Sequence, residues 1–425
     1  MDRRHFLGQS AAVAGLAFGL NGQAQASSLK SAQIVVVGAG YGGATAAKYL
    51  RMLSNNTAQV TLIEPSPQFI SCPLSNLVVG GSRQLNELSV QYSGLEKNHG
   101  IKMIKDSVAS IDRQKKTVQL ASGQTVKYDK LVLSPGIGLM MDKIEGLDAA
   151  NKAGVTFQAW KAGPETVALH KQISEMKDGG VYALSIPLAP YRCPPGPDER
   201  VCQVANYLKK NKPKSKVLVF DANQDVTSKG KLFKDAWANL YPGIIQYMPE
   251  HNVTAIDAKT RTIKFEVQED VKADVLNILP SMSAGDLIVK SGLADSNGRW
   301  SNVNFLNFES AVAKDIHIIG DSIQVAPAMP KSGHMANQHA KVTAAAIIAE
   351  LSNFAINPQP VLTNTCYSFV NDTDVVHVAS VHQYVAAEKT FKTVPGSGGL
   401  SPAATALEGT YAWGWAKNIW ADSLV

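Results

Sequence analysis

The chain contains 425 residues with a formal net charge of +6, and 45% of the residues are hydrophobic while 18% are charged. This length suffices for two or three domains with their own cores, and the composition is that of a globular protein. Lys and Arg form no block, so we expect no nucleic-acid partner. After the first 26 residues no apolar run approaches the length of a transmembrane helix, so we expect no integral membrane segment.

Residues 1–26 have the pattern of an export signal. Arg3 and Arg4 precede a short apolar run, and Ala24 and Ala26 frame an Ala-x-Ala cleavage site. This arrangement resembles a twin-arginine signal, which exports proteins that have already folded around a cofactor. We therefore expect a periplasmic mature chain.

A glycine motif follows the first apolar strand pattern. Residues 34–43 read IVVVGAGYGG, in which Gly38, Gly40 and Gly43 have the spacing G-x-G-x-x-G. The first glycine allows a tight turn, the second lets a pyrophosphate approach the backbone, and the third lets the next helix pack on its strand. We predict a helix at 44–52 and a second strand at 59–63, after which Glu64 is placed to accept hydrogen bonds from ribose hydroxyls.

Two later motifs indicate which dinucleotide is bound. Residues 130–136 (KLVLSPG) and 315–321 (DIHIIGD) each predict a buried strand that ends in a turn, and a helix is expected at 335–351. Both motifs resemble those of FAD-binding flavoproteins with two dinucleotide domains, in which Asp321 would contact the ribityl or pyrophosphate part of FAD. Gly136 and Lys331 are further candidate cofactor-binding residues. We expect a split FAD-binding domain at 27–150 and 272–355, to which a strand at 274–279 returns the chain.

Residues 151–271 predict a second Rossmann-like domain without its nucleotide motif. A helix at 163–176 and strands at 181–186, 216–221 and near 243–247 have the expected order. After the strand at 181–186, however, the chain reads PLAPYRCPPGPDER. Proline has no N–H to donate to phosphate and stiffens the turn. We therefore expect that this domain does not bind NAD(P)H.

The C-terminal segment, residues 356–425, predicts a smaller α+β domain. Trp413 and Trp415 alternate with smaller residues, which suggests a strand face. The four cysteines of the chain allow three complete pairings, and their spacing does not choose among them. They show no C-x-x-C or zinc-type pattern, so no metal site is expected. The cysteines are Cys72, Cys193, Cys202 and Cys366.

Taken together, these features resemble the flavoprotein subunit of flavocytochrome c sulfide dehydrogenase. The resemblance rests on the leader, the glycine motif and the segments ISCPLSN, YRCPPGPDER, GDSIQVAPAMPKSGHMAN and NTCYSFV. It implies an α/β fold with two dinucleotide-binding Rossmann-like domains of the glutathione-reductase type plus the smaller C-terminal domain.

The resemblance also implies roles for individual residues. Cys72 would hold FAD covalently as an 8α-thioether, and Cys193 and Cys366 would form a redox-active disulfide beside the flavin. Hydrosulfide opens disulfides by thiol exchange, and the product would be zero-valent sulfur or polysulfide; which cysteine is attacked stays open. Glu199 is a candidate proton acceptor. Cys202 has no role in this scheme. A disulfide between Cys202 and Cys193 would exclude the pairing of Cys193 with Cys366. The alternative to a redox-active pair is a purely structural bridge.

The electron acceptor implied by the resemblance is a separate c-type cytochrome subunit in a heterodimer. The chain has no C-x-x-C-H motif for a covalent haem of its own,. We take residues 356–425 as the candidate cytochrome interface. The alternatives are a sulfide:quinone reductase, an NAD(P)H-dependent reductase and a non-catalytic FAD subunit of a cytochrome complex.

Overall fold

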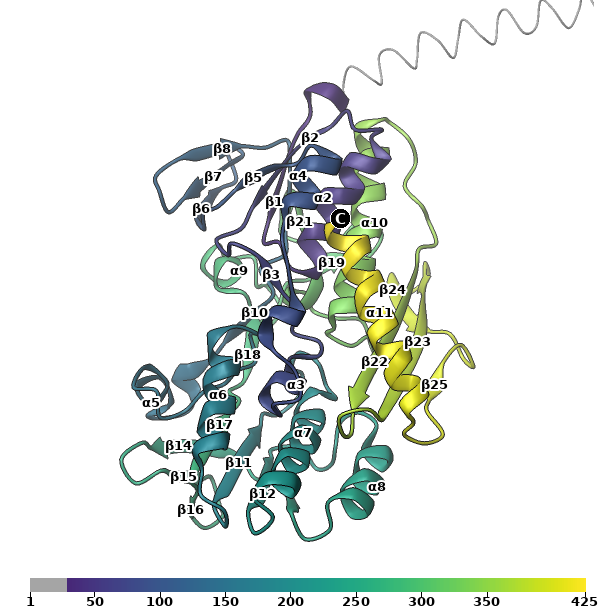
Figure 1. The fold of residues 1–425 in the computed structure, drawn as a ribbon. Coiled ribbons are helices and arrows are strands. Elements are labelled where there is room, and N and C mark those ends of the chain that lie inside the picture. Colours follow the sequence, from purple (N-terminus) through teal and green to yellow (C-terminus); the bar gives the residue numbers. More distant parts are fainter. Residues whose placement is uncertain (1–28) are drawn as a thin grey trace, which may run out of the picture.

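The computed structural model describes residues 29–425. The predicted export signal at 1–26 lies outside the described residues. Figure 1 shows two α/β domains, one above the other, with the C-terminal helix running along one side.

The first domain contains a seven-stranded sheet in the order β19-β20-β21-β9-β1-β2-β5. Its strands from β21 to β5 are parallel, and β1 and β9 have nearly continuous apolar sequences because both of their faces are covered,. Helices α2 (Tyr41–Leu53) and α10 (Gly333–Leu351) pack against each other beside this sheet. The parallel strands are β1 (Gln33–Val37), β2 (Gln59–Ile63), β5 (Lys102–Ile104), β9 (Lys130–Leu133) and β21 (Ala313–Ile318).

The middle domain is a second parallel sheet, in the order β13-β12-β11-β17. The predicted strands at 181–186 and 216–221 are confirmed, and α6 begins and ends within one residue of its prediction. The elements are α6 (Pro164–Glu175), β11 (Val181–Ile186), α7 (Gly196–Asn211), β12 (Lys216–Asp221), α8 (Gly230–Leu240), β13 (Ile245–Met248) and β17 (Val275–Ile278).

One strand belongs to a different sheet from the one predicted. The segment 274–279 was expected to return the chain to the first domain, but β17 pairs in parallel with β11, from Tyr182↔Val275 to Ser185↔Ile278. That expectation is wrong. A short apolar strand fits either buried parallel sheet, and its sequence pattern does not say which neighbour it pairs with. The Tyr182 hydroxyl donates to Asn277 Oδ1 (2.9 Å), which ties the two strands together.

The C-terminal domain is an antiparallel sheet covered by a long helix. The sheet contains β22 (Val361–Phe369), β23 (Val375–Val385), β24 (Thr390–Thr393) and β25 (Gly399–Leu400). The last helix, α11, spans Ala406–Leu424.

The expected strand at Trp413 and Trp415 is wrong, since both residues belong to α11. The buried side chains Ala412, Ala416 and Ile419 recur at the four- and three-residue spacing of a helix,. The Thr405 hydroxyl accepts a hydrogen bond from the Glu408 N–H (3.2 Å) and caps the helix,. The alternation of the tryptophans with small residues therefore did not reflect a strand.

Helix α11 is anchored on the first domain. Lys48 Nζ donates to the carbonyls of Ala421 (2.9 Å) and Val425 (2.6 Å), and Trp420 Nε1 donates to the Tyr41 hydroxyl (3.0 Å). Figure 1 shows the helix passing from α2 and α10 down to the C-terminal sheet. The C-terminal domain thus forms one wall of the space between the first two domains.

The remaining elements are short connections and two meanders. The meanders are β6 (Val108–Asp112), β7 (Thr117–Leu120) and β8 (Thr125–Lys127), and β14 (Val253–Asp257), β15 (Thr262–Phe265) and β16 (Val271–Lys272). The short strands are β3 (Phe69–Ile70), β4 (Ser89–Val90), β10 (Ile137–Leu139), β18 (Met282–Ala284), β19 (Val303–Asn304) and β20 (Glu309–Ser310). The short helices are α3 (Ser75–Val79), α4 (Ser93–His99), α5 (Leu147–Lys152) and α9 (Asp286–Lys290), with 3-10 turns at Leu85–Leu88, Met141–Lys143 and Gly320–Ser322.

Candidate functional site

A cavity of about 520 Å³ lies where the three domains meet. Its walls come from segments that are far apart in the sequence: the β1–α2 turn, the loop after β3, the β11–α7 turn, the start of α10 and the middle of β22. Nine of the predicted site residues line this cavity: Gly38, Gly40, Glu64, Cys72, Gly136, Cys193, Glu199, Asp321 and Cys366. Gly43 is not part of the cavity wall and packs against the Gly38 carbonyl.

The glycine turn leaves room for a ligand on one side only. A Cβ atom on Gly43 would lie 1.7 Å from the Gly38 carbonyl oxygen, so the third glycine is required for the helix to pack on its strand,. A Cβ atom on Gly40 would meet nothing within 4 Å. Gly38 has a φ of +89°, which a side chain would strain,. Backbone N–H groups are therefore open to the cavity at Gly40.

Glu64 follows β2 and lies in the cavity wall next to the glycine turn. One carboxylate oxygen accepts from the Ala39 N–H (2.8 Å) and the other from the Ser66 N–H (2.8 Å). These two bonds fix the carboxylate at the cavity wall. Each oxygen keeps a lone pair for a ribose hydroxyl.

Asp321 presents an unpaired acceptor to the cavity. Its Oδ1 atom is buried and has no hydrogen-bond partner among the described residues, and burial raises the pKa of the carboxyl. Leaving a buried polar atom unpaired costs about 1–3 kcal/mol. A ligand hydroxyl at this position would remove that cost.

The start of α10 faces the same cavity. Ser332 caps the helix by accepting from the Met335 N–H (3.0 Å), and both Ser332 and Gly333 line the cavity. The positive end of the helix dipole favours negative charge here.

Lys331 has a different position from the one expected of a direct ligand. It is 3% exposed, is not part of the cavity wall, and donates from Nζ to the carbonyls of Asp321 (2.9 Å) and Ile323 (2.5 Å). The ammonium lies 3.6 Å from the ring centre of Trp300. Lys331 therefore orders the segment that carries Asp321, and burial lowers its pKa to about 7.

These features fit FAD. The open backbone at Gly40, the fixed carboxylate of Glu64, the unpaired oxygen of Asp321 and the α10 N-terminus offer partners to a pyrophosphate, a ribose, a polyol chain and an electron-rich ring edge,. They lie along one continuous cavity.

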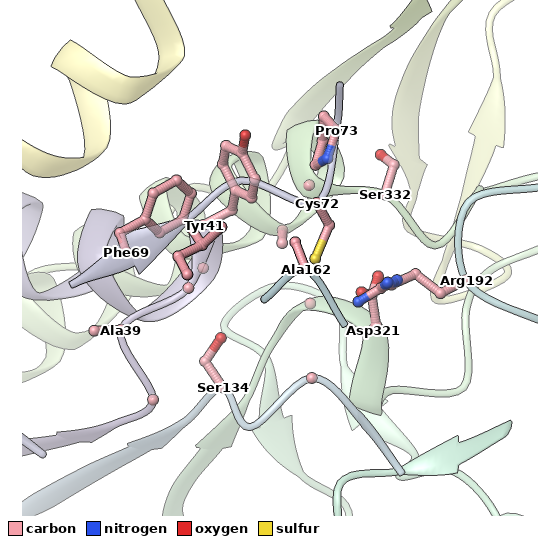
Figure 2. Close-up of a pocket in the computed structure, with 18 of the residues that line it drawn as sticks. Ala39, Tyr41, Phe69, Cys72, Pro73, Ser134, Ala162, Arg192, Asp321 and Ser332 are labelled. Atoms are coloured by element: carbon pink, nitrogen blue, oxygen red, sulfur yellow. The ribbon is translucent and has the colours of Figure 1, made fainter. Parts of the chain in front are cut away.

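Cys72 lies in the cavity wall between the glycine turn of the first domain and the middle domain. Figure 2 shows its sulfur pointing into the cavity, toward the side where Arg192 and Asp321 lie together. Arg192 is enclosed, and the charges of Cys72 and Asp321 raise its pKa against the effect of burial, which lowers it. Cys72 is thus a half-buried thiol beside a guanidinium.

The β11–α7 turn carries Cys193 in a strained conformation. Its φ is +56°, in the left-handed region that few side chains adopt,. The Cys193 N–H donates to the Lys331 carbonyl (2.8 Å), and its own carbonyl accepts from the Gly196 N–H (2.8 Å). This turn therefore joins the middle domain to the FAD motif of the first domain.

Cys366 lies on β22 and is held by polar neighbours. Its Sγ lies 3.5 Å from Asn364 Nδ2, and Asn364 in turn accepts from the Ser332 hydroxyl (2.7 Å). Burial, followed by the charge of Cys366, raises the pKa of Cys193. Cys193 and Cys366 are free thiols in this structure and line the same cavity. Their pairing stays a prediction.

Glu199 is buried at the start of α7 and bridges two domains. Its carboxylate accepts from Asn76 Nδ2 (2.8 Å) and from the Phe369 N–H (2.8 Å). Burial raises its pKa, whereas the hydrogen bonds and the charges of Lys229 and Arg200 oppose that rise. A carboxyl with a raised pKa in a cavity wall is a candidate for proton transfer.

Cys202 lies on α7 with its side chain fully buried and does not line the cavity. Burial raises its pKa. It is a free thiol here and packs in the core.

Sequence reasoning missed three cations beside the cysteines: Arg192, Arg200 and Lys229. Arg200 is 1% exposed and donates to Asn76 Oδ1 (2.9 Å) and Asn277 Oδ1 (2.9 Å), so it fixes the segments around Glu199. Arg192 and Arg200 belong to the YRCPPGPDER segment and could have been noticed there. Lys229 lies in a polar stretch with no signal in the sequence.

No group of three or more His, Cys, Asp or Glu side chains that could hold a metal ion occurs within residues 29–425. Over the same residues, no helix is both long and apolar enough to cross a lipid bilayer.

Comparison with protein families gives three matches. Residues 166–280 match the family described as sulfide dehydrogenase [flavocytochrome c] flavoprotein chain, central; residues 358–424 match flavocytochrome c sulphide dehydrogenase, flavin-binding; and residues 32–163 match pyridine nucleotide-disulphide oxidoreductase. The flavin-binding match supports FAD as the cofactor.

Individual relatives agree with these families. The flavoprotein chain of sulfide dehydrogenase from Chlorobaculum thiosulfatiphilum is 54% identical over 46 residues, which are 11% of this chain and 94% of that one. The mitochondrial sulfide:quinone oxidoreductase of Dictyostelium discoideum is 27% identical over 312 residues, or 68% of this chain and 65% of the relative. The chain thus spans slightly less than two thirds of that relative.

The fold is also that of a solved structure. The sulfide:quinone oxidoreductase from Aquifex aeolicus has a TM-score of 0.75 with 21% identity, and the match covers 92% of each chain. The predicted fold class, with two Rossmann-like domains, is confirmed.

Proposed function

Because the chain belongs to the family of flavoprotein chains of flavocytochrome c sulfide dehydrogenase, we propose that it is an FAD-dependent enzyme that oxidises hydrogen sulfide to zero-valent sulfur or polysulfide. The observation that carries this proposal is the meeting of Cys193 and Cys366, 173 positions apart, in the cavity that also holds the FAD motifs. Two cysteines beside a flavin are suited to a soft, two-electron sulfur donor.

In the proposed reaction, hydrosulfide attacks a bridge between Cys193 and Cys366. A bond forms between the substrate sulfur and one cysteine, the disulfide bond breaks, and the other cysteine leaves as a thiolate. The substrate sulfur is then held as a persulfide. FAD, when bound, supplies a two-electron acceptor that can pass its electrons on singly.

The residues around the cysteines support this chemistry. The prolines of the β11–α7 turn restrict the backbone around Cys193, and its N–H bond to Lys331 fixes the turn against the first domain. Glu199 takes the substrate proton, since burial raises the pKa of this carboxyl and so makes it a stronger base,.

The first experiment measures sulfide-dependent turnover in Cys193→Ser, Cys366→Ser and Cys202→Ala. We expect each serine variant to keep its FAD and to lose at least about 100-fold in sulfide oxidation, the size of effect typical for removal of a reacting group. Cys202→Ala is the control, because this buried thiol lies outside the cavity wall. Wild-type turnover in either serine variant would rule out the disulfide mechanism.

We also propose that Cys72 holds FAD covalently. The proposal is supported by its sulfur pointing into the cavity that carries the FAD motifs, toward the side where Arg192 lies. Acid precipitation of the purified protein tests the bond: yellow colour should stay with the wild-type chain and leave the Cys72→Ala chain. Free flavin in the wild-type supernatant would contradict the covalent link.

The proposed electron acceptor is a c-type cytochrome subunit that forms a heterodimer with this chain. Exposed apolar side chains of the C-terminal domain support a docking surface there, and they are Leu400, Leu407 and Tyr411. We expect Leu407→Lys to slow cytochrome reduction at least about tenfold, because interface anchors contribute about 2 kcal/mol or more. Reduction of the flavin by sulfide should not change.

The matched control for the interface is Val267→Lys, which changes an exposed apolar residue on the middle domain. Parallel assays with a soluble quinone separate the two acceptor classes. Faster turnover with quinone than with cytochrome c would replace the cytochrome proposal by a sulfide:quinone reductase, the activity named for several relatives.

Finally, we propose that the chain is exported to the periplasm through its twin-arginine leader. The motif at Arg3 and Arg4 supports this,. Cell fractionation of the wild type and of a variant with both arginines replaced by lysine tests it. The wild type should be periplasmic and the variant cytoplasmic, and equal distribution would contradict the proposal.

A further inference from the structure

Lys229 is a buried cation beside the cysteine pair. It directly precedes α8, with a φ of +58°, and its side chain reaches across to the C-terminal sheet, where it is 4% exposed overall. Its Nζ atom donates to the Cys366 carbonyl (3.0 Å), the Ser368 hydroxyl (2.7 Å) and the Val376 carbonyl (3.3 Å). All three acceptors are uncharged.

The charge of Lys229 has no ion-pair partner in the described part of the chain, residues 29–425. Burying an unpaired charge is unfavourable, which is why such lysines usually face an anion. The ionisable groups that act on it are Cys366 on β22, Glu199 and Asp198 on α7, and Cys193 in the turn before α7. The buried ammonium is therefore hydrogen-bonded to the backbone of Cys366, whose charge is the first to act on it.

The surroundings of the two cysteines differ. Burial raises the pKa of Cys366, and Lys229 is the first group that opposes this rise. Lys229 Nζ donates to the Cys366 carbonyl (3.0 Å), and Asn364 Nδ2 lies 3.5 Å from the Cys366 sulfur. For Cys193, the first effects after burial are those of Cys366 and Glu199, which raise its pKa, while Arg192 and Lys229 oppose them. Arg192 is also shared with Cys72 and Asp321.

We propose that Lys229 is a positioning residue that stabilises Cys366 as the leaving thiolate, so that the substrate sulfur is transferred to Cys193. This inference rests on the proposed function and adds to it the direction of the reaction. In thiol exchange the better-stabilised thiolate leaves faster. Hydrosulfide thus forms a bond to Cys193 Sγ, the bond to Cys366 Sγ breaks, and its electron pair stays on Cys366. The sulfide sulfur is oxidised to the persulfide level as the disulfide is reduced.

The first test locates the persulfide in the wild-type holoenzyme. The enzyme is mixed anaerobically with one equivalent of sulfide, quenched with iodoacetamide, and digested for mass spectrometry. We expect the additional sulfur on the peptide with Cys193 and a plain alkylated thiol at Cys366. Additional sulfur on Cys366 would overturn this inference alone, whereas no sulfur on either cysteine would overturn the proposed function as well.

The second test measures the pH midpoint of Cys366 alkylation in the holoenzyme reduced with a phosphine. We expect Lys229→Met to raise this midpoint by at least about one pH unit, a tenfold loss of thiolate, and Lys229→Arg to restore it. Lys231→Met is the control, because this exposed lysine lies two residues further along, in the first turn of α8, and pairs with Asp235. An unchanged midpoint in a folded Lys229→Met protein would show that the lysine is only a structural link between α8 and the sheet.

Discussion

The two parallel sheets of this protein each have a strand–turn–helix unit at the site, but the two turns are built differently. Between β1 and α2, glycines leave the backbone open, and a Cβ atom at Gly40 would meet nothing within 4 Å. Between β11 and α7, prolines remove N–H donors, and Cys193 of the turn and Glu199 at the start of α7 line the cavity instead,. Both turns face the same cavity.

The difference shows that the same strand–turn–helix unit can either bind a dinucleotide through its backbone or present reactive side chains. The end of a parallel strand followed by a helix is a common place for a ligand. In the first domain, the backbone supplies the contacts to a dinucleotide. In the middle domain, Cys193 of the equivalent turn lines the cavity shared by the three domains, and the bond from its N–H to the Lys331 carbonyl holds the turn against the first domain.

The largest effect is expected for Gly43→Val. Its Cβ atom would lie 1.7 Å from the Gly38 carbonyl, which neither backbone segment can avoid without opening the turn. We expect a loss of about 3 kcal/mol or more in stability and no retained FAD, measured by thermal unfolding and flavin absorbance. Gly414→Val on α11 is the control, since its Cβ atom would meet nothing within 4 Å. Normal FAD content in Gly43→Val would contradict the described turn.

Gly40→Ala should separate folding from cofactor binding. The added methyl group meets no protein atom but occupies the space through which a pyrophosphate reaches the backbone,. We expect an unchanged unfolding temperature and at least about tenfold weaker FAD binding, equivalent to about 1.4 kcal/mol, measured on a Cys72→Ala background so that the flavin can exchange.

The corresponding change in the second turn is Pro195→Ala. We expect it to leave FAD binding unchanged and to slow sulfide oxidation, because Pro195 stiffens the segment that holds Cys193. Should Pro195→Ala weaken FAD binding as much as Gly40→Ala does, the proposed division between the two turns would be wrong.

Glu199→Gln sharpens the comparison at the first turn of α7. Both carboxylate oxygens accept hydrogen bonds, from Asn76 and from the Phe369 N–H, so the new amide must direct one donor at another donor. We expect a loss of about 1–3 kcal/mol in the free energy of unfolding. Chemical denaturation measures it, and the pH profile of turnover should lose the limb that reports the Glu199 carboxyl. A stable variant with an unchanged profile would remove Glu199 from the reaction.

His334, in the cavity wall at the start of α10, is expected to affect stability only at acidic pH. Its Nδ1 accepts from the Thr365 N–H (3.0 Å), and burial lowers its pKa to about 4. Because the folded pKa lies below the unfolded value of 6.5, its contribution to stability is complete above pH 6.5 and is lost as the pH falls toward 4,. We expect a loss of about 1–2 kcal/mol at pH 5 relative to pH 7.5. Thermal unfolding of His334→Asn should show a flatter pH dependence, and an equal slope in both proteins would contradict the assignment.

Much of the site could be predicted from short motifs. Gly38, Gly40 and Glu64 were found because a dinucleotide turn constrains local backbone, and local constraints are visible in sequence. Cys193 drew attention because a proline-rich turn stood where glycines were expected. These predictions depended on neighbours within a few residues.

Other features depend on distant contacts and could not be predicted. The sheet that β17 joins is decided by pairing with β11, almost a hundred residues earlier. Lys229 reaches the Cys366 carbonyl across 137 positions, and its own segment contains nothing unusual. Helix α11 was taken for a strand because two tryptophans alternate with small residues, although its capping residue, Thr405, was present in the sequence.

The central claim is that the β11–α7 turn supplies sulfur chemistry in place of a nicotinamide nucleotide. The most direct test compares anaerobic bleaching of the flavin by sulfide and by NADH in the same stopped-flow experiment with the wild-type protein. The account predicts rapid bleaching by one equivalent of sulfide and none by NADH over the same time. Bleaching by NADH, with no response to sulfide, would contradict it and would assign the chain to the pyridine-nucleotide reductases.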